Sequence, residues 1–261
     1  MHNDKRSFRR SPLLTTLSRR DLLGFAAKGA ASVVVSQTLL GCSPNSVLGA
    51  DTTGTGADTD AASTSCVLTA ALTEGPFFVD EKLNRSDIRS DPATGTISAG
   101  VPLGLTFNVS RVETSACTPL TGAYVDVWHC DAAGAYSDVS GSSRKFLRGY
   151  QITDQAGIVR FTTIYPGWYS GRAVHVHFKL RLFAGATKTY EFTSQFFFNE
   201  SLTDNVHAQT PYSGKGRRNV LNTNDGIYNS LSATQRAGLT LQTATDGNGY
   251  AGVINLGVRV G

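Results

Sequence analysis

The sequence predicts an all-β domain, an antiparallel β-sandwich with long loops and little helix. Short runs rich in Val, Ile, Phe, Tyr and Thr are separated by Gly, Pro, Asn and Asp, which is the pattern of strands joined by turns. Several runs alternate apolar and polar residues, as half-buried strands do. After residue 65 the chain contains no long amphipathic helical pattern. Together these features favour two packed antiparallel sheets.

We predict strands over residues 102–112, 122–130, 147–153, 157–164, 173–183, 189–198 and 250–260. In the second range, Ala123, Val125 and Val127 alternate with polar or aromatic neighbours, so one face of that strand should enter the core. Residues 201–240 are less regular, and we expect a long loop and a short helix there.

The range 173–183 carries the most informative pattern. Its two faces are sharply different: an apolar one with Val174, Val176, Phe178, Leu180 and Leu182, and a polar one with His175, His177, Lys179 and Arg181. Two imidazoles therefore stand side by side on one face of a strand. The plain alternative is a solvated polar face with no ligand.

The N-terminal segment is predicted to direct export rather than to join the fold. Residues 18–23, SRRDLL, form a twin-arginine pattern, and a modestly apolar stretch then ends in LLGC at Cys42. That ending resembles a lipoprotein processing site, so we expect a signal peptide over 1–41 and a lipid on Cys42. A transmembrane helix is the alternative, but Lys28 and three glycines disfavour it. The expected location is the cell envelope or the exterior, with attachment to a membrane.

Composition then divides the rest of the chain. Residues 42–65 are rich in Thr, Ala, Gly, Asp and Ser and are expected to form a flexible tether, which leaves 66–261 as one domain. The segment 1–41 has seven basic and two acidic residues, a net charge of +5 against +4 for the whole chain, so the remainder is nearly neutral at −1. There is no electrostatic basis for nucleic-acid binding.

The cysteines are consistent with export. With Cys42 assigned to the lipid, an oxidising compartment allows one disulfide, and we predict Cys66–Cys117 because both lie near segment ends. Cys130 falls within a predicted strand and is expected to be a buried thiol.

Two tyrosines lie near the paired histidines in the sequence. Tyr169 belongs to PGWYSGRAVHVHF, where Pro166 and Gly167 predict a turn that can bring it back over His175 and His177. Tyr136 ends the run DVWHCDAAGAY. Phenolate is a hard anionic donor that favours an oxidised, trivalent metal, and imidazole binds most first-row metals. The combination suggests a mononuclear non-haem Fe(III) centre, although either tyrosine alone would be read as a structural residue.

These residues resemble the intradiol ring-cleavage dioxygenases, the family of catechol and protocatechuate 3,4-dioxygenases. The resemblance runs through residues 72–89, 122–139 and 146–180, and is most specific in the last. The chain is most similar to the exported single-domain branch. The resemblance implies that Tyr136, Tyr169, His175 and His177 are the iron ligands. It also implies that Arg172 and Gln195 line the substrate site and that GPFF (75–78) forms one wall of it.

The implied activity is insertion of both atoms of O2 into a catechol-type ring to give a cis,cis-muconate-type product. In this scheme Tyr169 acts as a base toward the substrate and Arg172 stabilises developing negative charge. His129 and Asp131 are expected to be structural, and His207 is assigned no role.

Two other classes of function stay open. One is a zinc hydrolase that uses His175 and His177 with a carboxylate, and the other is a non-catalytic exported sandwich that binds carbohydrate or protein. A ferric phenolate centre is coloured and a zinc centre is not, so the colour and the iron content of the purified protein separate these possibilities.

Overall fold

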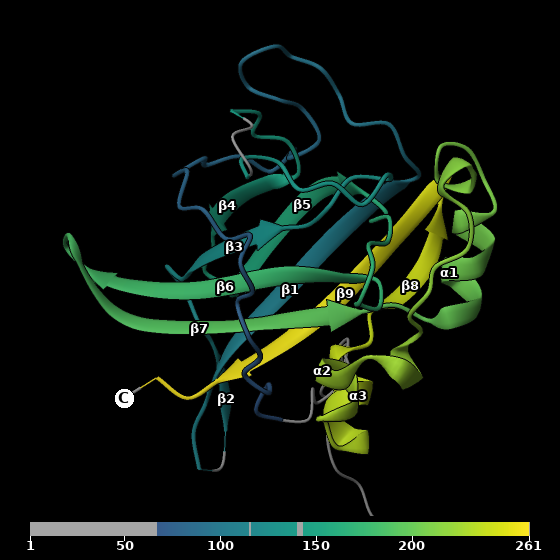
Figure 1. The fold of residues 1–261 in the computed structure, drawn as a ribbon. Coiled ribbons are helices and arrows are strands. Elements are labelled where there is room, and N and C mark those ends of the chain that lie inside the picture. Colours follow the sequence, from purple (N-terminus) through teal and green to yellow (C-terminus); the bar gives the residue numbers. More distant parts are fainter. Residues whose placement is uncertain (1–66, 115, 140–142, 261) are drawn as a thin grey trace, which may run out of the picture. The chain divides into compact units, whose positions relative to one another are not determined.

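Two β-sheets face each other in a computed structural model of the chain (Figure 1). One apolar core lies between them. The structure describes residues 67–114, 116–139 and 143–260. Phe107 of one sheet contacts Phe178 and Phe196 of the other, with ring centroids 5.7 Å and 6.0 Å away. The predicted β-sandwich is therefore confirmed.

The first sheet is built around β1 (Pro102–Val112), which pairs with several partners. Its order is β2 (Cys117–Pro119), β1, β9 (Gly249–Val258) and β8 (Gln242–Asp246), with β5 (Ile158–Ile164) also paired to β1. The second sheet has the order β4 (Arg148–Ile152), β3 (Tyr124–Trp128), β6 (His175–Ala184) and β7 (Thr187–Phe197).

The prediction differs from the structure in three details. β1 and β9 pair in parallel, so the first sheet is mixed; these strands lie far apart in the sequence, and no hairpin forces them to run in opposite directions. The short β2 and the polar β8 were not predicted, because neither carries an apolar alternation. The irregular region holds three short helices rather than one: α1 (Glu200–His207), α2 (Gly226–Asn229) and α3 (Ala233–Leu239).

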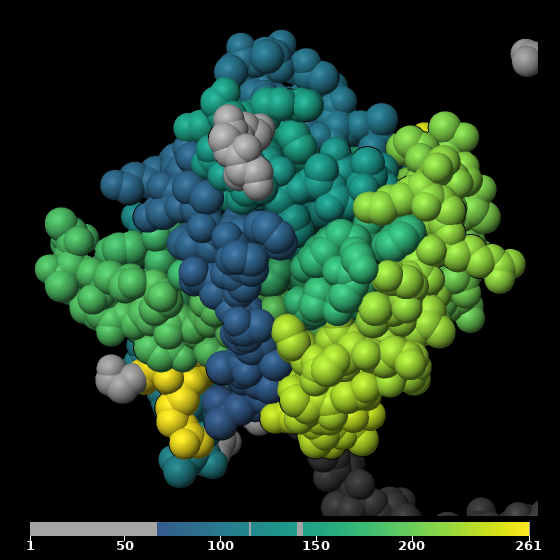
Figure 2. Space-filling view, in the orientation of Figure 1, coloured from purple at the N-terminus to yellow at the C-terminus, as the bar shows by residue number. Residues whose placement is uncertain are grey.

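The two faces of β6 divide as predicted, but its polar face is not solvated. Val176, Phe178 and Leu180 are fully buried in the core. His175, His177, Lys179 and Arg181 on the other face are also at most 7% exposed. The segment 72–82, blue in Figure 2, crosses the green strands and covers them. The alternative of a solvated polar face is therefore wrong.

The remaining sequence predictions have mixed outcomes. Cys130 is a buried free thiol, as predicted, and Cys117 is disulfide-bonded. Cys66, Cys42, the signal segment and the tether lie outside the described residues. Among the described residues, no helix is both long enough and apolar enough to cross a membrane.

Candidate metal centre

Three neighbouring strands bring one row of side chains together. His177 on β6 lies opposite Trp128 on β3 and opposite Gln195 on β7. Because partners across a ladder point to the same face of a sheet, the indole, the imidazole and the carboxamide stand side by side. The indole of Trp128 stacks on His177 with centroids 5.0 Å apart and planes 9° apart. This stacking holds the imidazole of His177 in one orientation.

Two loops add the tyrosines. Tyr136 follows a tight turn in which the carboxylate of Asp131 accepts hydrogen bonds from the backbone N–H groups of Ala133 and Ala135, both at 2.9 Å. Gly134 in this turn has φ +82°, and a Cβ there would collide with the carbonyl of Trp168. The turn after β3 is thus fitted closely against the loop that carries Tyr169.

The four predicted ligand residues converge. Nε2 of His175 lies 3.0 Å from Nε2 of His177 and 3.2 Å from the hydroxyl of Tyr169. The ring of Tyr136 lies 5.7 Å from that of Tyr169 and 6.2 Å from that of His177, between centroids. The structure therefore gathers two phenols and two imidazoles from β6 and two separate loops.

The hydrogen bonds of this cluster suit a cation. Nδ1 of His175 donates to the carbonyl of Ala173 at 2.6 Å, which leaves the Nε2 lone pair directed into the cluster. Two imidazole nitrogens that each bind one metal at about 2.0–2.1 Å and about a right angle to each other lie about 3 Å apart, as the two Nε2 atoms do. The hydroxyl of Tyr136 is buried and has no well-formed hydrogen bond in the described structure. An ion bound here would satisfy these groups.

Burial controls the charge state of the cluster. Desolvation lowers the pKa of His175 to about 3 and that of His177 well below its usual range, so both rings are neutral and can act as ligands. Desolvation also raises the pKa of Tyr136 and of Tyr169. The phenols would thus ionise against a bound cation rather than on their own.

Arg172 and Gln195 complete one side of the cluster. Nη2 of Arg172 donates to Oε1 of Gln195 at 2.7 Å, and Nη1 lies 3.4 Å from Nε2 of His175. Gln195 is fully buried and donates in turn to the carbonyl of Thr73 at 2.7 Å. A fixed positive charge therefore borders the four ligand residues.

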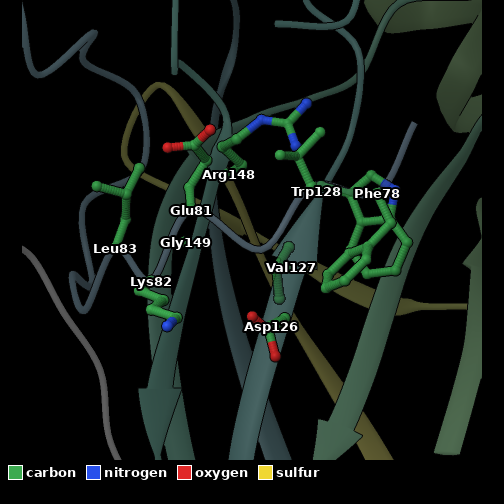
Figure 3. A pocket seen from close by; sticks show the side chains of 10 residues that line it. Phe78, Glu81, Lys82, Leu83, Asp126, Val127, Trp128, Arg148 and Gly149 are labelled. Carbon is green, nitrogen blue, oxygen red and sulfur yellow. The ribbon is translucent and has the colours of Figure 1, made fainter. Parts of the chain in front are cut away.

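The opposite wall of the cluster comes from residues 72–82, the covering segment that lies over the polar face of β6. Gly75 has φ +70°, and a Cβ there would lie 3.4 Å from Cε1 of His177. Phe77 stacks on Tyr136 with centroids 4.2 Å apart, and Phe78 packs against Trp128 at 4.9 Å. Figure 3 shows Phe78 and Trp128 together at one side of a small crevice whose volume is about 10 Å³. None of the four proposed ligand residues lines this crevice, so it is separate from the cluster.

The other residues weighed from the sequence lie outside the cluster. His129 is buried and bonded to Thr163 and to the carbonyl of Cys130, and His207 bonds the carbonyl of Pro166. Asp131 makes the turn described above. Sequence reasoning missed Asp225, whose carboxylate binds Arg172; it lies in the irregular region, with no motif to mark it.

A carboxylate does not join the histidines. Within the part of the chain that the structure describes, no three His, Cys, Asp or Glu side chains form a group able to hold a metal. The zinc-hydrolase alternative, which needs such a group around His175 and His177, therefore gains no support from the geometry.

The known proteins that this chain resembles are dioxygenases. The family model described as dioxygenase matches residues 73–216. Chlorocatechol 1,2-dioxygenase from Rhodococcus opacus is 28% identical over 133 residues, which are 43% of this chain and 51% of that protein, so the match spans about half of the curated relative.

Several solved structures have a similar fold. The intradiol ring-cleavage dioxygenase from Tetranychus urticae superposes with a TM-score of 0.65 and 29% identity, over 74% of this chain and 95% of that chain. The dioxygenase domain of a dioxygenase and carbohydrate-binding fusion protein from Streptomyces sp. SirexAA-E superposes with a TM-score of 0.53 and 28% identity. The superposition covers 75% of this chain and 100% of that chain.

Proposed function

Since this chain belongs to the intradiol ring-cleavage dioxygenase family, we propose that it is an Fe(III)-dependent enzyme that cleaves a catechol-type ring. The observation that carries the proposal is the convergence of two phenols and two imidazoles, with both Nε2 atoms 3.0 Å apart. Tyr136, Tyr169, His175 and His177 would hold the iron. When bound, a ferric ion would supply Lewis acidity and an electron acceptor for a catechol-type substrate.

The net reaction is balanced without a further cofactor. The bond between the two hydroxyl-bearing ring carbons breaks, and one oxygen atom of O2 is added to each carbon. A catechol thus becomes a cis,cis-muconic acid, and the substrate itself supplies the electrons that reduce O2.

Residues around the proposed iron site have distinct roles in proton transfer, charge stabilisation and exclusion of water. Tyr169 is half-buried, whereas Tyr136 is only 8% exposed, so Tyr169 is the phenol that an entering hydroxyl can reach and whose oxygen can accept its proton. Nη1 of Arg172 faces the cluster and stabilises negative charge on the bound ring. Gln195 orients Arg172, and Phe77 and Phe78 exclude water on the opposite side.

Purified protein tests this proposal directly. The iron-loaded chain should be red-brown, hold about one iron per chain, and take up one O2 per catechol cleaved. A panel of catechol, protocatechuate, hydroxyquinol and a larger phenol, followed by oxygen uptake, would define the substrate. A colourless protein that binds zinc in place of iron and consumes no O2 would contradict the proposal.

The proposal extends to location. The SRRDLL pattern and LLGC ending support export of the folded protein and a lipid on Cys42, which lies outside the described residues. Export in folded form would allow iron to be loaded before the chain leaves the cytoplasm. Membrane fractionation of the wild type and of Cys42→Ser tests this, because the variant should leave the membrane fraction.

A further inference from the structure

Asp225 binds Arg172 from outside the segment that the family model matches, which ends at residue 216. Its side chain is fully buried. A buried carboxylate is retained only where hydrogen bonds or an ion pair compensate for its desolvation. Here both carboxylate oxygens are engaged, and they connect two different parts of the protein.

The first oxygen fixes Asp225 to its own helix. Oδ1 accepts hydrogen bonds from the backbone N–H groups of Ile227 at 2.8 Å and Tyr228 at 2.9 Å, so Asp225 is the N-cap of α2. The ring of Tyr228 packs edge-on against Phe197 with centroids 5.0 Å apart, and Phe197 is the partner of His175 across β6 and β7. Asp225 is thereby fixed relative to the strand that carries His175.

The second oxygen fixes Arg172. Oδ2 accepts from Nε of Arg172 and from the backbone N–H of Ala173, both at 2.8 Å. Burial acts to raise the pKa of Asp225, but these bonds and that from Tyr228 outweigh it and hold the pKa below its usual value. The ion pair therefore persists at neutral pH.

The guanidinium of Arg172 is consequently held on two edges. Nε is bound by Asp225 and Nη2 by Gln195, while Nη1 faces His175. Because the guanidinium is planar and rigid, fixing two edges also fixes the direction of the third. We propose that Asp225 is a positioning residue that aims the Nη1 edge of Arg172 at the substrate bound by the metal centre; this inference rests on the proposed function.

The first test is Asp225→Ser, in which the hydroxyl can still cap α2 but is too short to reach Arg172. We expect kcat with catechol to fall about ten- to a hundredfold, as for other residues that orient a reacting group, with a smaller change in KM. Iron content and the visible absorption should stay close to wild type. Ser232→Ala is the matched control, because it removes the N-cap of α3 and touches no residue of the cluster.

The second test asks whether Asp225 acts through Arg172. In an Arg172→Ala background, adding Asp225→Ser should lower kcat no further, since the group that it positions is gone. A purely structural role predicts the opposite: a second, additive loss, together with lower iron content and a lower Tm of the metal-free protein. Either that pattern or an unchanged kcat in the single variant would overturn the proposal.

If Asp225→Ser does not fold, Asp225→Asn keeps the size of the side chain and the cap but sets an amide N–H2 group against Nε of Arg172, and the same criteria apply. If the wild type measured in parallel consumes no O2 with any catechol, the proposed function has failed; an active wild type with fully active Asp225 variants means that only the positioning role has failed.

Discussion

The indole of Trp128 lies parallel to the imidazole of His177, with ring centroids 5.0 Å apart. Trp128 is 1% exposed, and its Nε1 has no hydrogen-bond partner in the described structure, so it acts through its ring face and not through a donor. Its ring also packs against Phe78 of the segment 72–82, with centroids 4.9 Å apart. One aromatic side chain thus links the predicted ligand to the wall of the site.

This stacking predicts a graded response at position 128. Trp128→Ala should lower the free energy of unfolding by about 3–5 kcal/mol and weaken iron binding, because it leaves a cavity beside His177. Trp128→Phe keeps an aromatic face and loses no hydrogen bond, so it should retain most of the stability and most of the iron affinity. Urea unfolding and iron titration measure the two effects. Equal iron affinity in all three proteins would show that the stacking does not orient His177.

His177→Ala should lose iron. The variant removes one of two neutral imidazole nitrogens that face each other 3.0 Å apart, and the methyl group of alanine carries no atom that can bind a metal. Iron per chain, measured after reconstitution, should fall to a small fraction of the wild-type value. His207→Gln is the control and should keep full iron, since His207 bonds the carbonyl of Pro166 and its ring packs on Tyr165 and Tyr212, none of which is a proposed ligand. Full iron and activity in His177→Ala would refute the ligand assignment.

Tyr169→Phe should separate iron binding from turnover. Three of the four proposed ligands remain, so part of the iron should be retained, but the oxygen that accepts the substrate proton is lost. We expect a shifted visible band and a fall in kcat of about a hundredfold or more. Tyr165→Phe removes a different buried hydroxyl, which bonds Thr203 at 2.7 Å, and should cost about 1 kcal/mol of stability without changing kcat. Normal turnover in Tyr169→Phe would show that Tyr169 does not act as the base.

Local features of this chain can be predicted from its sequence, whereas contacts between distant segments cannot. We could predict the strand that carries His175 and His177, and the buried face of β3. In both, apolar and other residues alternate along consecutive positions of the sequence, as in a strand. The covering of β6 by residues 72–82 was not predictable, because it depends on ion pairs such as Arg181–Asp80 between distant segments.

The same limit applies within the site. Asp225 and Arg172 are 53 positions apart in the sequence, and the packing of α2 against β7 brings them together. No local pattern marks an aspartate that caps a four-residue helix as part of a site. The parallel pairing of β1 with β9 is equally non-local, since it joins the first and the last strand of the described domain.

Arg181 provides a test of the covered polar face of β6. Its guanidinium donates to both carboxylate oxygens of Asp126, at 2.8 Å and 3.0 Å, and to Asp80. Arg181→Met should destabilise the fold by about 3–5 kcal/mol, because it leaves Asp126 buried without its cation. Asp80 is 37% exposed, so Asp80→Asn should cost less than about 1 kcal/mol. Equal unfolding midpoints for the two variants in urea would show that this face is effectively solvated.

His129 predicts how stability depends on pH. Burial lowers its pKa from 6.5 to about 4, and the neutral ring donates from Nδ1 to the carbonyl of Cys130 and accepts at Nε2 from Thr163. Above pH 6.5 the ring is neutral in both states and its full contribution is present. Between 6.5 and about 4 only the unfolded chain binds the proton, so stability falls as the pH falls, by about 3 kcal/mol in total. Below about 4 the ring is protonated in both states and the loss stops.

The variant that isolates this effect is His129→Gln. This variant should be less stable than the wild type at pH 7, because its amide cannot reproduce both hydrogen bonds. Between pH 7 and pH 4, however, its free energy of unfolding should fall by about 3 kcal/mol less than that of the wild type. Urea unfolding at several pH values in this range, with iron content held equal, measures the difference in slope. The comparison must be made between variants because other buried histidines also bind protons on unfolding. Parallel pH profiles for the two proteins would mean that His129 is already protonated in the folded state, in conflict with its hydrogen bond from Thr163.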